Sequence, residues 1–156
     1  MSYMATIHSN WMTTFEGLKF SSKDFYGMVE KRVKAHAVPA VKVSRINYNE
    51  GGLLSSKREY LRVEYRHLAF EICAAPFGND FFVSWWFGNT STLQNDIVRK
   101  LFKGLLGETA TYYRLDTQAM FMENVRLSIT RAIEEMTAAK GFKAINENTW
   151  RVAEPA

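Results

Sequence analysis

The spacing of hydrophobic positions changes along the chain. Between residues 40 and 88 apolar side chains recur at about every second position, whereas in 22–35 and 116–140 they recur at every third or fourth. A period of two is typical of β-strands, and a period near 3.6 is typical of amphipathic α-helices. The pattern therefore predicts strands in the middle of the chain, with helices before and after them.

The strand pattern divides into consecutive segments joined by turn residues. In the clearest segment, Leu61, Val63 and Tyr65 share one face and charged residues occupy the other. Pro76 to Asp80 form a turn sequence, and short turns join antiparallel neighbours, so the later segments predict a meander. The predicted strands are 40–48, 59–66, 68–77 and 80–88.

Three helices are expected. The first opens with Ser22 as its N-cap, and the last begins at Asp116 and stops at Lys140-Gly141, with glycine just past the end. The last helix carries the longest apolar stripe, which we expect to be buried against the sheet. The stripe consists of Phe121, Val125, Ile129, Ala132, Ile133 and Met136. The helices cover 22–35, 92–106 and 116–140, an extended segment is expected at 109–115, and a final hairpin at 142–152.

These elements predict the α+β class. We expect an antiparallel sheet, a meander of four or more strands, packed by about three helices that include a long C-terminal one. A chain of 156 residues without a linker or low-complexity segment is expected to form a single domain over residues 1–156.

The strand 80–88 is apolar on both faces. Phe81, Val83, Trp85 and Phe87 alternate with Phe82 and Trp86, and only Ser84 interrupts the pattern. Either the hairpin that this strand forms with the preceding strand, which we call the aromatic hairpin, is covered on both sides within the chain, or its second face meets another subunit or a membrane. The candidate interface residues are Phe77, Phe82, Trp85 and Trp86.

Charge leaves the class of partner open. The chain has 20 basic and 16 acidic residues, a net charge of +4, which suits an anionic partner without requiring one. The outward positions of strand 59–66 and its flanks mix cations with an aromatic ring, as surfaces that hold phosphates and stack bases do. An ordinary solvated sheet face has the same pattern. The candidate anion-binding residues are Arg58, Tyr60, Arg62 and Arg66.

The sequence contains few arrangements of residues that are suited to catalysis. His67, Glu71 and Cys73 share one strand face, but the first and last are separated by roughly 20 Å at about 3.3 Å per residue, too far for a Cys–His pair. Glu71, between two apolar neighbours, needs a basic partner such as Arg62 on the next strand or a shifted pKa. The histidines are scattered, there is a single cysteine, and no phosphate-binding loop is present, so we expect no metal site and no cofactor. The sequence therefore favours a binding protein over an enzyme.

The cellular compartment is inferred from the cysteine content and from the N-terminal residues. The single cysteine, Cys73, cannot form an internal disulfide, and the N-terminal residues lack a signal-peptide pattern, so we expect a cytoplasmic protein. The segment 92–106 has a basic and an apolar face, which suits packing on a sheet and, as a weaker alternative, peripheral contact with a membrane.

Two blocks of the sequence resemble a family of bacterial proteins of unknown function. The blocks are "EYLRVEYRHLAFEICAAPFGNDFFVSWWFG" and "TYYRLDTQAMFMENVRLSITRAIEEMTAAKGF", within roughly residues 58–88 and 110–145. Some such proteins carry hydrophobic spans after the Ser-Trp-Trp stretch, whereas positions 89–106 are amphipathic here. The resemblance implies no activity, cofactor or catalytic residue.

The sequence thus favours a non-catalytic interaction or ligand-binding module that forms a homo-oligomer, or binds a partner protein, through the aromatic hairpin. The alternative is an anion binder, for a nucleotide or nucleic acid, that uses the basic strand face. An enzyme of unrecognised type is the third hypothesis.

Overall fold

The computed structural model describes residues 3–49, 51, 57–91 and 112–141. The elements of these residues, in chain order, are β1 (Tyr3–Phe15), α1 (Ser22–Ala35), β2 (Val41–Asn49), β3 (Lys57–Tyr65), β4 (Leu68–Phe77), β5 (Asp80–Ser91) and α3 (Tyr112–Ala139).

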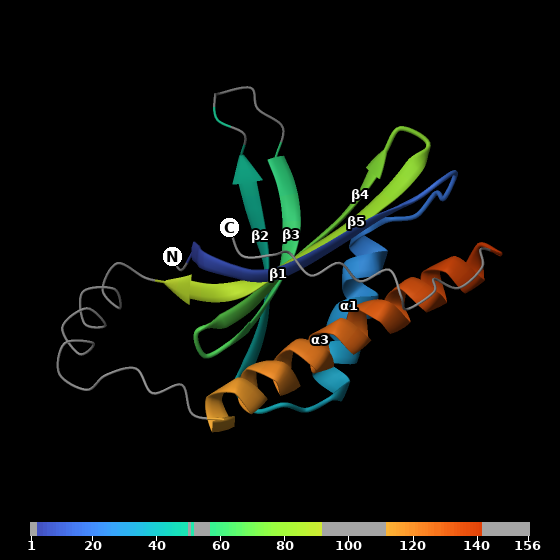
Figure 1. Cartoon of the computed structure of the whole chain (residues 1–156). Coiled ribbons are helices and arrows are strands. Elements are labelled where there is room, and N and C mark those ends of the chain that lie inside the picture. The colour runs from blue at the N-terminus through green and yellow to red at the C-terminus, as the bar shows by residue number, and fades with distance from the viewer. Residues whose placement is uncertain (1–2, 50, 52–56, 92–111, 142–156) are drawn as a thin grey trace.

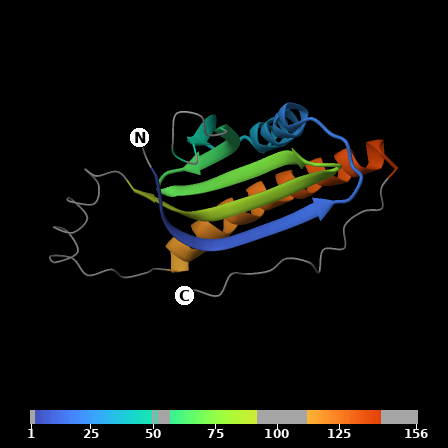
Figure 2. The same ribbon diagram turned by 90° about the horizontal axis from the view of Figure 1, so that it is seen from above.

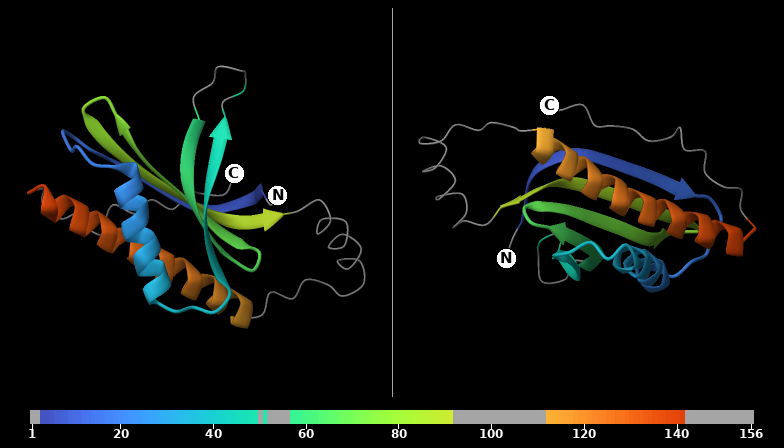
Figure 3. Two further views of the ribbon diagram at one scale, coloured as in Figure 1. Left: turned by 180° about the vertical axis from the view of Figure 1, so that it is seen from behind. Right: turned by 90° about the horizontal axis from the view of Figure 1, so that it is seen from below.

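The strands form one antiparallel sheet of five strands in the order β1-β5-β4-β3-β2 (Figure 1). The strands β2 to β5 follow one another as a meander, and the N-terminal strand β1 adds to the free side of β5. Seen from above, β1, β5 and β4 lie over α3, and α1 lies beside β4 (Figure 2). Seen from below, α3 runs along the sheet (Figure 3, right). The two described helices therefore lie on one side of the sheet.

The α+β class, the antiparallel meander and the long C-terminal helix are confirmed, but the number of helices is not. The described residues contain two helices, whereas about three were predicted; the predicted helix 92–106 and the predicted hairpin 142–152 lie outside the described residues. Strand β1 was not predicted, because Ser9 and Thr13 share its inward face with Trp11 and weaken the alternation.

Two local boundaries also differ from the prediction. The cap of α1 is Ser21 and not Ser22: its hydroxyl oxygen accepts a hydrogen bond from the backbone N–H of Asp24 at 3.2 Å. Helix α3 already includes 112–115, which were expected to be extended. Aromatic residues favour strands only weakly, and here continuity with the helix outweighs that preference.

The core lies between the sheet and the helices. Phe70 of β4 stacks on Phe87 of β5 with ring centroids 4.7 Å apart, and both rings contact Phe121 of α3. The predicted stripe of α3, from Phe121 to Met136, is buried in this core. Ring pairs at such distances add to the stabilisation that burial alone provides.

The sheet divides near its middle. Strands β3 and β4 pair only from Leu61 opposite Ile72 to the turn that joins them. Beyond this point Tyr26 of α1 lies between the strands: its hydroxyl donates to the carbonyl of Glu59 at 2.8 Å and accepts from the N–H of Ala74 at 2.9 Å. Figure 1 shows β2 and β3 rising away from β4, β5 and β1 at this end. One side chain thus satisfies two backbone groups that a continuous ladder would have paired.

We call the face of the sheet opposite the helices the open face, because neither described helix packs on it. Side chains alternate along each strand, so the register assigns its members. From β1 to β2 they include Met12 and Thr14; Phe82, Ser84 and Trp86; Glu71, Cys73, Ala75 and Phe77; Arg58, Tyr60 and Arg62; and Ile46 and Tyr48.

Candidate functional site

Aromatic side chains of the open face gather at the β4–β5 hairpin. Phe77, the last residue of β4, is 76% exposed, and Phe82 and Trp86 of β5 are half-buried. Trp85 differs from the other predicted interface residues: it is only 4% exposed and contacts the ring of Phe70 in the core. Adjacent residues of a strand point to opposite faces, so Trp85 and Trp86 could not both lie on the open face. The candidate surface therefore includes Trp86 and omits Trp85.

A hollow of about 270 Å³ lies beside these aromatic residues. Phe77 and Phe82 line it together with Arg58, which sequence reasoning had placed in a separate, anion-binding set. Its remaining described lining is Thr14, Ala75 and Pro76. These small side chains carry no signal of their own in the sequence, because only the pairing of β1 with β5 brings Thr14 to this place.

The middle of the open face holds a buried ion pair. Glu71 accepts a hydrogen bond from Nε of Arg62 at 3.1 Å and a further one from Nη2 of the same guanidinium. The hydroxyl of Tyr48 also donates to this carboxylate, at 2.8 Å. Burial, with the bond to Glu71, raises the pKa of Tyr48 to about 12. Arg62 is only 3% exposed, so its charge is used inside the fold and does not face a ligand.

Next to this pair lie Tyr60 and Cys73, both on the open face. Burial raises the pKa of the Cys73 thiol, and the positive charge of Arg58 and a hydrogen bond with Tyr60 offset this only in part. Burial likewise raises the pKa of Tyr60. A buried, protonated thiol is a poor nucleophile, so the contact between Tyr60 and Cys73 fits a packing role better than a catalytic one.

Arg66 lies apart from the other predicted anion-binding residues. Strand β3 ends at Tyr65, and Arg66 sits in the turn before β4 with a positive φ of 56°. Its guanidinium lies 5.1 Å from the ring centre of Tyr65. The predicted set of Arg58, Tyr60, Arg62 and Arg66 is therefore divided between the hollow, the buried pair and this turn.

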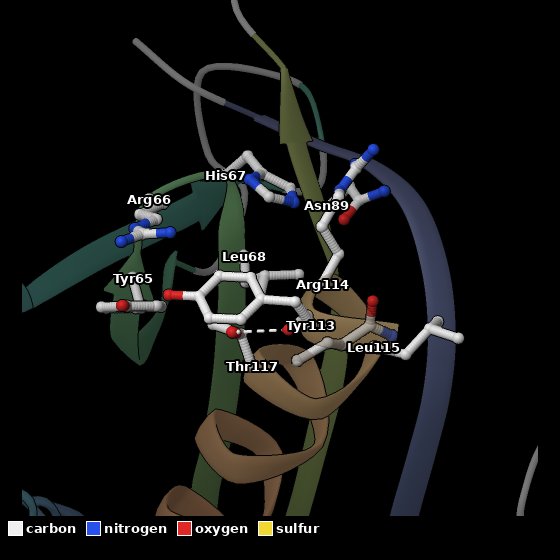
Figure 4. Close-up of a pocket in the computed structure, with 10 residues that line it drawn as sticks. Tyr65, Arg66, His67, Leu68, Asn89, Tyr113, Arg114, Leu115 and Thr117 are labelled. Atoms are coloured by element: carbon white, nitrogen blue, oxygen red, sulfur yellow. Dashed lines mark hydrogen bonds between the residues drawn. The ribbon is translucent and has the colours of Figure 1, made fainter. Parts of the chain in front are cut away.

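A second concavity, of about 460 Å³, lies at the β3–β4 turn, where the first turns of α3 approach it (Figure 4). We call it the end pocket. Sequence reasoning did not find it, because its lining comes from three segments far apart in the chain. The residues that bear on its chemistry are Tyr65, Arg66, His67, Asn89, Tyr113 and Arg114.

Other kinds of site are not seen in the described part of the chain. No group of three or more His, Cys, Asp or Glu side chains there is arranged to hold a metal ion. Neither described helix combines the length and apolar character needed to cross a membrane. Comparison of the chain with models of protein families and with curated proteins finds no match.

Proposed function

We propose that this protein is a non-catalytic interaction module that self-associates through the hairpin end of its open face. The observation that carries the proposal is Phe77, a large aromatic side chain with 76% of its surface exposed at the rim of a hollow. Exposed aromatic residues beside a concave surface are typical of the residues that contribute most to protein interfaces.

The shape of this surface suits a second copy of the chain. A two-fold dimer brings the same patch of both protomers together, so a projection must face a depression on its own surface. Phe77 provides the projection, and the hollow lined by Thr14, Ala75 and Phe82 provides the depression. In such a dimer each Phe77 enters the hollow of the other copy, and Arg58 at its edge forms part of a polar rim.

The basic strand face has less support as a binding surface. Arg62 is paired with Glu71, and Arg66 has left the strand, which leaves Arg58 as the exposed cation of the original set on the open face. One exposed arginine gives little affinity for a nucleic acid, because that affinity grows with the number of phosphates contacted.

We place the self-associating protein in the cytoplasm. Its single cysteine, Cys73, is buried and free, so the fold does not depend on a disulfide or on an oxidising compartment.

The substitution Phe77→Glu tests the proposal. A carboxylate at the centre of an apolar contact would lose hydration without gaining a partner, so we expect the variant to be a folded monomer. Sedimentation equilibrium over a range of protein concentrations measures the association, and circular dichroism checks the fold. Met120→Glu is the matched control, since Met120 is also an exposed apolar residue but lies on α3. We expect the control to associate as the wild type does.

A second variant fills the hollow and leaves Phe77 in place. Thr14→Trp adds a large side chain at an exposed position of the edge strand β1, and we expect it to weaken association as well. A wild-type protein that stays monomeric at several hundred micromolar would refute the proposal. So would an unchanged dimer in both variants.

A further inference from the structure

The end pocket has a basic rim. Arg66 and His67 come from the β3–β4 turn, and Arg114 comes from the first turn of α3 (Figure 4). Among the lining residues that the structure describes, none is Asp or Glu. Arginine side chains hold phosphate and carboxylate groups through charge-assisted hydrogen bonds, so the rim favours an anionic ligand.

The wall of the pocket contains an unsatisfied acceptor. The side-chain carbonyl oxygen of Asn89, on β5, is buried and has no hydrogen-bond partner within the described part of the chain. A buried carbonyl without a donor is unfavourable, and most such groups in proteins are paired. A ligand that carries a hydroxyl or amino group next to its anionic group would supply the missing donor.

The backbone of Arg66 is held in an unfavourable conformation. Its φ of 56° lies in the left-handed region, which glycine adopts freely and arginine does not. The two-residue turn between the paired residues Tyr65 and Leu68 imposes this conformation, as tight hairpin turns do. In this conformation the guanidinium lies over the ring of Tyr65, at the rim of the pocket.

The pocket also offers an aromatic surface. Tyr113 lines it while 72% of the residue remains exposed, so its ring is open to a flat ligand. All four nucleobases stack on such rings, because each has a flat aromatic face. The volume of about 460 Å³ falls in the usual range of small-molecule sites.

From these features we propose that the end pocket binds a mononucleotide. The phosphate lies against the basic rim formed by Arg66, His67 and Arg114, the base stacks on Tyr113, and a hydroxyl or amino group donates to Asn89. This site is separate from the self-association surface, and it uses only one residue, Arg66, of the basic strand face expected from the sequence.

The test is isothermal titration calorimetry of the full chain with adenosine 5′-monophosphate, at low and at physiological salt. We expect saturable binding that weakens as salt is added, because the rim contacts are ionic. Arg114→Gln removes one of these contacts and should weaken binding by about tenfold or more, the usual effect of losing a charge-assisted hydrogen bond. Arg131→Gln, an exposed site further along α3, is the matched control and should bind as the wild type does.

Arg66→Gly is the second variant, and it separates binding from folding. Glycine accepts the positive φ, so we expect the thermal midpoint to stay equal or to rise while the affinity for the nucleotide falls. The absence of saturable binding of the adenosine, guanosine, cytidine and uridine monophosphates would overturn the proposal, as would equal affinities in wild type, Arg66→Gly and Arg114→Gln.

Adenosine and inorganic phosphate, titrated alone, test the two halves of the ligand. We expect each to bind more weakly than the nucleotide, because each meets only one part of the pocket. Inorganic phosphate that binds as tightly as the nucleotide would refute the stacking role of Tyr113. Adenosine that binds as tightly would refute the role of the basic rim.

Discussion

Arg62 and Glu71 face each other on neighbouring strands of the open face, and both are buried. The attraction between two buried charges is largely offset by the cost of removing them from water, so such a pair adds little net stability. Each charge alone, however, would be strongly unfavourable. The pair therefore makes each residue dependent on the other.

This dependence can be measured. We expect Arg62→Met to lower the free energy of unfolding by about 3–5 kcal/mol, because it leaves the carboxylate of Glu71 buried without its cation. The double variant Arg62→Met with Glu71→Leu should recover most of that loss, since neither charge remains. Urea unfolding of the wild type, both single variants and the double variant gives the coupling. If the loss of unfolding free energy in the double variant equals the sum of the losses in the two single variants, the two side chains contribute independently.

At the scale of elements, one hydroxyl group links α1 to two strands of the sheet by hydrogen bonds. Tyr26 joins Glu59 of β3 to Ala74 of β4 at the point where the two strands part. Burial raises the pKa of Tyr26 far above its usual range, so the hydroxyl stays protonated and can donate. The helix thus supports the divided sheet by hydrogen bonding as well as by packing.

Removing the hydroxyl should destabilise the protein without changing its fold. We expect Tyr26→Phe to cost about 1–3 kcal/mol, because it leaves a buried carbonyl and a buried N–H unpaired. Tyr112→Phe removes a hydroxyl from an exposed residue and should have no measurable effect. Thermal and urea unfolding compare the two variants. Equal stability of both would mean that water satisfies Glu59 and Ala74 once the hydroxyl is gone.

The same elements show how far the sequence predicts the fold. The predicted strands from 40 to 88 and the first helix agree closely with the structure, because strand 59–66 and the first helix follow a regular apolar period and turn residues mark the ends of the later strands. Strand β1 was missed because polar residues stand at inward positions and its partner β5 is distant in the chain. The end pocket was missed for a similar reason, since no local pattern relates Asn89 to Arg114.

On the scale of the whole molecule, the two candidate surfaces lie at opposite ends of β4. The hollow is at Phe77 and the end pocket is at Leu68, ten residues of strand apart when both ends are counted. At about 3.3 Å per residue this is roughly 30 Å, so a partner at one end does not cover the other. Self-association and nucleotide binding should therefore be independent.

Single variants at each surface test this independence. We expect Phe77→Glu to leave the affinity for adenosine 5′-monophosphate unchanged, and Arg66→Gly to leave the association constant of the protein unchanged. Titrations and sedimentation on both variants provide the comparison. A nucleotide affinity that falls together with association would place the two sites in one coupled unit, contrary to the separation seen here.

The pairing of β1 with β5 also determines the order in which the protein can form during synthesis. Tyr3 lies opposite Ser91, so β1 is synthesised before the other four described strands and must wait for its partner β5, the latest of them. Until then the aromatic residues Trp11 and Phe15 lack the neighbours that bury them in the finished sheet. Contacts so distant in the chain slow folding, and an unpaired strand with exposed aromatic side chains is prone to aggregation until its partner strand is made.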